Sequence, residues 1–201
     1  RNNMAVFTAK KFNISALTGI SAKHIEEHVK LYDGYVKNSN MIMDKVAELM
    51  SDPEGNAYML GELRRRLSFE YNGMRNHEVY FSAFEGGPQT LKDGELKKMI
   101  EGCWQSLDSL VMNIKHAAAT TRGIGWAVLW YDRKENKLLV SWVDEQHLGQ
   151  LNDCAMILAL DMWEHSYVAD YQPSGKKQYI EDFFANLNWD IVEENFKKAD
   201  R

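Results

Sequence analysis

The chain has few of the residues that disulfide scaffolds, collagens and membrane spans require. It holds two cysteines, Cys103 and Cys154, among 201 residues, and they form no C-x-x-C pair. This excludes a disulfide framework and a zinc ribbon, and it suits a reducing compartment, so we expect a cytoplasmic location. No run of about 18 apolar residues occurs, which predicts no transmembrane helix and no membrane partner. Only 3 prolines and 13 glycines exclude collagen and most disordered classes.

An excess of basic residues is also lacking. The 24 lysines and arginines are outnumbered by 29 aspartates and glutamates, which gives a net charge of −5. Nucleic-acid-binding proteins normally present a basic face, so we expect no nucleic-acid partner. Residues 1–7 contain no long apolar stretch, so we also expect no secretory signal. The composition, 45% apolar and 26% charged, is typical of a globular protein with a real core.

The first third of the chain has the pattern of two long helices. Ser21 is a suitable N-cap, and apolar residues recur at helical spacing through 21–50. The sequence S-D-P-E-G-N at 51–56 predicts a turn. A second helix should cover 57–84, and the Gly-Gly-Pro at 86–88 should end it. Two long helices with a short connection predict an antiparallel helical hairpin.

The rest of the chain mixes helices with short strands. We expect helices at 91–101, 105–121, 176–186 and 188–196, and strands at 125–131, 137–143 and 154–160. Helices come first, then a small sheet, then helices again, so the pattern predicts an α+β fold rather than alternating β-α-β units. We place an N-terminal α-hairpin domain at 1–88 and a C-terminal α/β domain at 89–201.

Several common catalytic motifs are missing. The chain has no H-E-x-x-H, no G-x-S-x-G and no Walker loop. Gly123-Ile124-Gly125 lacks the third glycine of a dinucleotide fingerprint and follows a helix. No histidine has a glutamate three residues before it, which excludes the E-x-x-H pairs of di-iron bundles. The remaining hypothesis is a site for a single metal ion, with ligands from the two long helices and from the end of a strand.

Asp161 and His165 form the tightest cluster of ligand-type residues. On a straight strand, residues four apart would be separated by roughly 13 Å, too far to share one ion. Asp161 directly follows an apolar run, so it should lie where a strand ends and the chain can turn. A carboxylate with an imidazole suits iron or manganese. The alternative is a solvated aspartate and a core histidine beside Trp163.

The other histidines have structural alternatives too. His77 lies among aromatic residues on the second long helix, where a lone histidine is more often a hydrogen-bonded core residue. His24 and His28 are four apart and share a helix face, so they could bind one metal or simply line the surface. His28 falls on the apolar stripe. His116 and His147 are expected to be structural or exposed.

Five separated segments resemble one known family. They are Asp161-Met-Trp-Glu-His165-Ser-Tyr167, Asn76-His77, Gly123-Ile-Gly125-Trp126-Ala127, Tyr35-Val36-Lys37-Asn38 and Asn188-Trp189. Together, and in the order in which they follow one another along the chain, they are similar to the iron/manganese superoxide dismutase family over nearly the whole chain. The resemblance implies a long N-terminal α-hairpin followed by an α/β domain with a three-stranded antiparallel sheet.

The resemblance also implies an activity and a cofactor. The family converts superoxide to dioxygen and hydrogen peroxide by redox cycling of a single Mn or Fe ion per subunit. Three histidines and one aspartate hold the ion, with solvent as a fifth ligand. Carried over, His77, Asp161 and His165 are three ligands, and His28 of the first helix is our choice for the fourth.

The first-helix ligand departs from the family pattern. That pattern usually places the ligand eight residues before the gateway tyrosine, which here is Tyr35, and the eighth residue before it is Glu27. The usual second histidine, four residues after the ligand, is replaced by Tyr32 if His28 is the ligand. A one-residue shift in helix bulging could restore His28 to the metal. Glu27 and His24 are the alternatives.

A glutamine near the metal is the next implication. Gln146 resembles the glutamine that hydrogen-bonds the metal-bound solvent, although the neighbouring His147 could take this role. In the family that glutamine can also come from the position four before the second ligand, and here this position is Gly73. Gln146 with Gly73 resembles the manganese arrangement more than the iron arrangement, which gives a lean towards Mn.

The remaining implications concern access and assembly. Tyr35 resembles the phenol at the mouth of the substrate channel, and Trp126 and Trp163 resemble the aromatic shell that keeps the site dry. Glu164 and Tyr167 resemble the residues that bridge to a partner subunit, which implies a homodimer, with a tetramer as the alternative. A non-catalytic structural or interaction module that kept this fold is the competing function.

Superoxide is an anion, and the chain is net negative. Long-range attraction by the whole molecule is therefore not expected, and only charges within about 8 Å of the substrate should matter at physiological salt. Four lysines are candidates for this local attraction, with ordinary solvated lysines as the alternative: Lys30, Lys37, Lys176 and Lys177.

Overall fold

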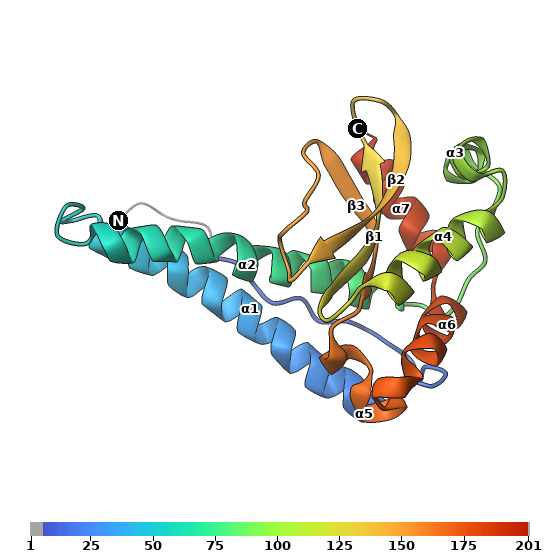
Figure 1. Cartoon of the computed structure of the whole chain (residues 1–201), viewed down its shortest axis with the longest axis horizontal. Coiled ribbons are helices and arrows are strands. Elements are labelled where there is room, and N and C mark those ends of the chain that lie inside the picture. The colour runs from blue at the N-terminus through green and yellow to red at the C-terminus, as the bar shows by residue number, and fades with distance from the viewer. Residues whose placement is uncertain (1–5, 201) are drawn as a thin grey trace.

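The N-terminal part of the molecule is a long helical hairpin, as expected. The computed structural model describes residues 6–200. Helices α1 (Ala22–Leu49) and α2 (Ala57–Ser82) pack side by side along their length and extend away from the rest of the molecule (Figure 1). The Ser21 hydroxyl accepts a hydrogen bond from the backbone N–H of His24, which confirms the predicted N-cap. The turn at 51–56 is also confirmed.

The residues before α1 contain no helix or strand from residue 6 to residue 20. This segment is held against the hairpin, since the Asn40 carboxamide accepts from the backbone N–H of Phe7 and the Tyr32 hydroxyl accepts from that of Lys10. Residues 1–5 lie outside the described residues.

Several expected helix boundaries differ from the structure by up to four residues, and Asn188 contacts the chain near two of them. Helix α2 ends at Ser82 rather than 84, because the next residue, Ala83, uses its carbonyl to accept from the Asn188 N–H. Helix α3 (Glu95–Trp104) begins four residues later than expected. The chain before it is held extended by an isolated bridge between Gln89 and Asn188. Helix α4 (Leu107–Thr120) then follows with a Ser106 N-cap.

A three-stranded antiparallel sheet forms the centre of the C-terminal part. Strands β1 (Gly125–Asp132), β2 (Lys137–Asp144) and β3 (Cys154–Asp161) lie in the order β2-β1-β3. The register pairs Trp126 with Asp161, so the start of β1 and the end of β3 lie side by side at the same end of the sheet. Strand β1 is almost entirely buried, with β3 packed against both α2 and α7. The expected α+β fold is confirmed.

The segment after β3 is more structured than the sequence suggested. It contains two 3₁₀ turns, η1 (Glu164–Ser166) and η2 (Pro173–Gly175), and a short helix, α5 (Val168–Tyr171). Helices α6 (Lys176–Asn186) and α7 (Trp189–Ala199) complete the fold. The turns have too few residues for helical periodicity to reveal them, yet η1 is what bends the chain back towards α1.

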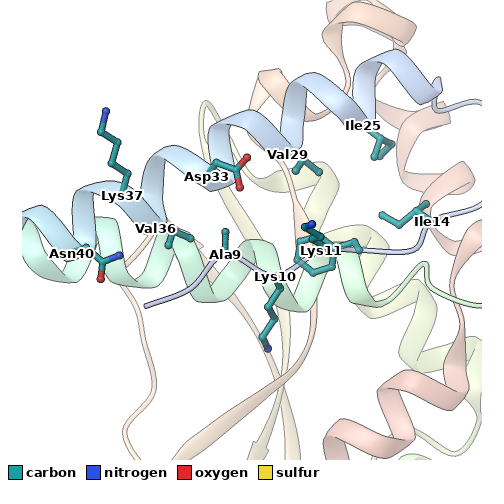
Figure 2. Close-up of a pocket in the computed structure, with 11 residues that line it drawn as sticks. Ala9, Lys10, Lys11, Ile14, Ile25, Val29, Asp33, Val36, Lys37 and Asn40 are labelled. Carbon is teal, nitrogen blue, oxygen red and sulfur yellow. The ribbon is translucent and has the colours of Figure 1, made fainter. Parts of the chain in front are cut away.

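The outside of the molecule was searched for membrane-spanning helices and for grooves. Throughout residues 6–200, no helix combines the length and apolar character needed to cross a bilayer. A groove of about 840 Å³ lies where the segment at residues 9–14 runs past α1 (Figure 2). Ile25 and Val29 form part of its apolar wall, and Lys37 lies at its edge. The metal-ligand candidates do not line this groove.

Candidate metal centre

Four side chains from three separate segments, α1, α2 and the end of β3 with the turn after it, meet at one point. Their ligand-type atoms all lie within 4.8 Å of one another, and the four residues are His28, His77, Asp161 and His165. The first three are buried, and the His165 side chain is 23% exposed. Each of the three imidazoles points its Nε2 atom towards Asp161 Oδ2, at 3.0 Å, 3.4 Å and 3.3 Å respectively.

The bend after β3 brings the closest pair in the sequence together. Asp161 is the last residue of β3, and His165 lies in η1 immediately afterwards. The Trp163 N–H donates to Asp161 Oδ1 at 2.9 Å, which holds this bend and leaves Oδ2 directed at the imidazoles. The strand-end turn predicted from the spacing is therefore what allows residues four apart to share one ion.

The rotation of α1 decides which of its side chains enters the cluster, and this side chain is His28. The helix is uninterrupted from Ala22 to Leu49, so the predicted shift in bulging is wrong. Seven residues of an ideal α-helix turn through about 700°, only about 20° short of two full turns. His28 and Tyr35, seven apart, therefore project on the same face without a bulge. The Glu27 side chain is instead 59% exposed and paired with Lys30.

His24, the other alternative, is outside the four-residue cluster. Its ring centroid is 6.0 Å from that of His28. His24 is nonetheless only 7% exposed, more buried than its place on the helix suggested, and its Nε2 atom has no hydrogen-bond partner in the described part of the chain.

The orientation of His77 leaves a bare lone pair at the centre. Its Nδ1 lies 2.6 Å from the Gly73 carbonyl oxygen, which can only accept, so Nδ1 carries the proton. Nε2 is then an acceptor, and it faces the carboxylate Oδ2 of Asp161 at 3.4 Å with no hydrogen-bond partner within residues 6–200. Two buried acceptors facing each other repel unless a cation lies between them.

Protonation does not supply that cation at neutral pH. Burial lowers the pKa of His77 to about 3, and burial also lowers the pKa of His28. Burial on its own would raise the pKa of Asp161, but His165 and His28 outweigh it and hold that pKa well below its ordinary value. One carboxylate and three imidazoles match the donor set of a divalent or trivalent first-row metal ion. The residues present therefore fit one ion.

The metal-free protein should lose stability as the pH falls from about 6.5 to about 4.5. His77 has a pKa of about 3 when folded and an ordinary value of 6.5, so only the unfolded chain binds a proton in this range. The free energy of unfolding should fall by about 2 kcal/mol from this group. Urea titrations of wild type and His77→Gln, both metal-free, test it, and equal pH slopes would contradict it.

A hydrogen-bonded chain connects the access side of the centre to its interior. The Trp126 indole N–H donates to Gln146 Oε1 at 2.9 Å, and Gln146 Nε2 donates to the Tyr35 hydroxyl at 2.9 Å. The Tyr35 ring stacks on His77 with centroids 5.1 Å apart, and the Trp126 ring meets the same imidazole edge-on at 5.0 Å. Gln146 is fully buried, and the Asn76 side chain donates to the backbone carbonyl of Gln146.

Gly73 leaves the space that Tyr35 occupies. A Cβ atom at Gly73 would lie 2.4 Å from Cδ1 and 2.6 Å from Cε1 of the Tyr35 ring. No real Cβ approaches a carbon this closely, so a longer side chain there would displace the tyrosine.

The other predicted residues lie at the edges of the centre. The Trp163 ring stacks on His165 with centroids 5.4 Å apart, and its indole N–H donates to the Glu145 carbonyl. His147 packs edge-on against Phe69, with its Nδ1 unpartnered within the described residues, while Gln146 contacts Tyr35. His116 is exposed, as expected.

The bridge candidates differ in exposure. Glu164 is exposed, while Tyr167 is 5% exposed and stacks on Tyr179. Tyr179 was not among the predicted site residues. Its hydroxyl donates to the Asp161 backbone carbonyl and shares a hydrogen bond with the Tyr80 hydroxyl. Helical spacing marked this tyrosine only as part of a helix, and nothing local indicated its long-range partner.

Known proteins match this chain over most of its length. A model of the iron/manganese superoxide dismutases, C-terminal domain, matches residues 92–195. A superoxide dismutase [Fe] of Aquifex aeolicus is 35% identical over 188 residues, which cover 91% of this chain and 87% of that protein. A superoxide dismutase [Fe] of Cupriavidus metallidurans is 33% identical, with 92% of each chain covered. A superoxide dismutase [Mn] of Mycobacterium intracellulare is 29% identical, covering 86% of this chain and 82% of that protein. The chain belongs to the iron/manganese superoxide dismutase family.

Proposed function

We propose that this protein is a superoxide dismutase that uses one iron or manganese ion held by His28, His77, Asp161 and His165. One observation carries the proposal: the bare Nε2 of His77 faces the Asp161 carboxylate inside a buried cluster, an arrangement that needs a cation. The relatives named as iron and manganese superoxide dismutases support the reaction, in which two superoxide ions and two protons become dioxygen and hydrogen peroxide.

The bound ion would supply one-electron redox chemistry, which zinc lacks. Gln146 together with Gly73 favours manganese, whereas relatives bearing either metal in their names support both. Iron and manganese therefore both belong in the test of this proposal.

Tyr35 is proposed as the proton source at the entrance. Its hydroxyl oxygen accepts from Gln146, so its own hydrogen is not used in that bond and can be donated into the cavity. Burial raises the pKa of Tyr35 well above its ordinary value, and the nearby Asp161 carboxylate adds to the effect, so the phenol stays protonated at neutral pH. Gln146 fixes the position of this phenol because Trp126 holds the other end of the amide.

Gln146→Ala should keep the metal and lose turnover. The side chain is not among the four ligand candidates, but it orients Tyr35 and borders the centre. Outer residues of this kind typically contribute a factor of about 10 to 100 in activity. Metal analysis and superoxide turnover should be measured on wild type, Gln146→Ala and a control, Gln178→Ala, whose exposed side chain donates to Asp182 away from the centre. Unchanged turnover would show that another residue holds the phenol.

The proposed function is tested by loading the metal-free protein with iron and with manganese separately. Near-stoichiometric uptake of at least one metal and fast superoxide turnover are expected. The competing hypothesis, a non-catalytic structural or interaction module with this fold, predicts full folding with no turnover after loading with either ion. That result would overturn the proposal.

We also propose that the chain forms a homodimer, with a tetramer as the alternative. Glu164 is exposed beside His165, whose side chain is 23% exposed although it belongs to an otherwise buried centre. A second copy seated there would bring Glu164 to the partner's centre, with Tyr167 packed behind it. Sedimentation velocity tests this assembly, and a monomer at micromolar concentration would contradict it.

Two further proposals concern the domain boundary and the cellular location. The boundary between an N-terminal hairpin domain, 1–88, and a C-terminal domain, 89–201, is supported by the family match, which begins at residue 92. A cytoplasmic location is supported by the free thiols of Cys103 and Cys154. Limited proteolysis near residue 88 and cell fractionation test these two proposals.

A further inference from the structure

A hollow of about 360 Å³ leads to the metal centre between α1 and α2. Tyr35 and Trp163 both line it. Since Tyr35 stacks on His77 and Trp163 stacks on His165, the hollow touches the aromatic groups that cover two of the ligand candidates. It is therefore the route by which a small molecule can approach the centre.

Arg66 presents an oriented positive charge in this hollow. Its guanidinium carbon lies 3.8 Å from the centroid of the Phe69 ring, and its Nε donates to Glu70 Oε1 at 3.2 Å. These two contacts fix the plane of the guanidinium, because a ring face and a carboxylate constrain it from different directions. The side chain is 49% exposed, and no acceptor within residues 6–200 bonds its two terminal nitrogens.

Glu70 lies deeper than the arginine that it holds. Its side chain is 7% exposed, and it also accepts from the Asn38 side chain at 3.4 Å. A carboxylate this close to the route would repel an anion if it stood alone. Arg66 is the more accessible of the two charges, so it both screens Glu70 and offers free N–H donors.

The lysines suggested by the sequence do not fill this position. Lys37 lies at the groove of Figure 2, and Lys176 donates to the Ala119 and Thr121 carbonyls at the end of α4. Lys177 lines a separate hollow beside α4. Lys30 does line the route, but its ammonium group is paired with Glu27 at 2.7 Å and Glu26 at 3.7 Å.

We propose that Arg66 is the residue that receives the anionic substrate at the entrance, and that Glu70 is a positioning residue that orients it. The proposal rests on the proposed function, since it assigns a role toward superoxide, a small monoanion. The chain carries a net charge of −5, so attraction must come from charges near the route. At physiological salt the screening length is about 8 Å, which restricts the effective charges to groups such as Arg66.

The same helix supplies a matched control pair. Arg65 and Glu62 form an ion pair at 2.8 Å, with side chains 69% and 45% exposed, and neither lines the hollow. Arg65→Gln and Glu62→Gln change the net charge of the chain as Arg66→Gln and Glu70→Gln do. Any difference between the two sets therefore reports position rather than total charge.

The experiment uses the metal-loaded protein and azide as a probe anion. Azide dissociation constants from visible spectra and second-order rate constants for superoxide should be measured at low and at physiological salt. At low salt, Arg66→Gln should weaken azide binding about threefold, the factor that Coulomb's law gives for one unit charge at an assumed separation of about 8 Å and a dielectric constant of about 60. The rate constant should fall by a similar factor and depend less on salt.

Glu70→Gln should act in the opposite direction, tightening azide binding, because the glutamine amide oxygen can still accept from Arg66 Nε and orient it while the negative charge is removed. A purely structural role would weaken binding in both variants. The double variant, Arg66→Gln with Glu70→Gln, should return close to wild type. Both control variants should stay within about 1.3-fold of wild type at physiological salt.

Two outcomes overturn the inference. If Arg66→Gln matches Arg65→Gln in a protein that dismutates superoxide, Arg66 has no role at the entrance and the proposed function stands. If Glu70→Gln weakens azide binding as Arg66→Gln does, the pair serves packing alone. A loaded wild type without turnover instead overturns the proposed function, and this inference with it.

Discussion

Asp161→Asn should abolish metal binding and, with it, dismutation. The substitution keeps the size of the side chain and its hydrogen bond from the Trp163 N–H, but it removes the only carboxylate in the cluster. Metal retained after dialysis should fall at least tenfold, and turnover should fall by more than about 100-fold, since this residue is a direct ligand candidate. Metal analysis and a superoxide assay on the same samples measure both effects.

The same variant should behave differently when no metal is present. In metal-free wild type, Asp161 Oδ2 faces the lone pair on His77 Nε2. An asparagine amide can turn its NH₂ group towards that atom and donate, but it then no longer accepts from His28 Nε2 and His165 Nε2, so metal-free Asp161→Asn should differ in stability from metal-free wild type by no more than about 1–3 kcal/mol. Removing an unpaired buried acceptor is worth about 1–3 kcal/mol. Urea unfolding measures this difference.

Asp153→Asn is the matched control for both measurements. Asp153 directly precedes the same strand, β3, and pairs with Lys134 at the surface, where its side chain is 57% exposed. It should keep full metal and turnover. A metal-bound, active Asp161→Asn would contradict the assignment of Asp161, whatever its stability.

Gly73→Ala should lower both stability and turnover while keeping the metal. The new Cβ would lie 2.4 Å from the Tyr35 ring, so the ring must move and its hydrogen bond with Gln146 must lengthen or break. Overpacking of this kind costs about 1–3 kcal/mol. Displacing a group that positions the reaction costs about 10- to 100-fold in turnover. Thermal unfolding and the superoxide assay measure the two effects.

Gly61→Ala, on the same helix, is the control. A Cβ at Gly61 would meet no heavy atom within 4 Å. Alanine has the higher helix propensity, so this variant should gain about 0.5–1 kcal/mol of stability with unchanged turnover. If both alanine variants behave alike, the close approach of Gly73 and Tyr35 does not matter for activity.

Most of the fold could be predicted from local patterns. Helical spacing and the Ser21 cap located α1, and the apolar run before Asp161 located the end of β3. The last residue of α2 and the first residue of α3 could not be predicted, because the chain between them contacts Asn188, more than 90 residues away along the chain. No local pattern contains such a partner.

Part of the site was also contained in the sequence. The spacing of Asp161 and His165, together with the strand end, indicated that these residues could share an ion. The choice among Glu27, His28 and His24 stayed open, because it depends on how α1 is rotated against α2 and β3. Only the packed structure places His28 Nε2 at 3.0 Å from Asp161 Oδ2.

The sequence by itself determined which residue types were available and how they repeat along each helix and strand. The tertiary structure decided which of them meet: that the Gly73 carbonyl turns the lone pair of His77 inwards, and that Arg66 lines the hollow beside Tyr35 with only its Nε bonded to Glu70. The physical reason is that periodicity sets directions within one element, whereas distances between elements arise only when their buried faces pack together.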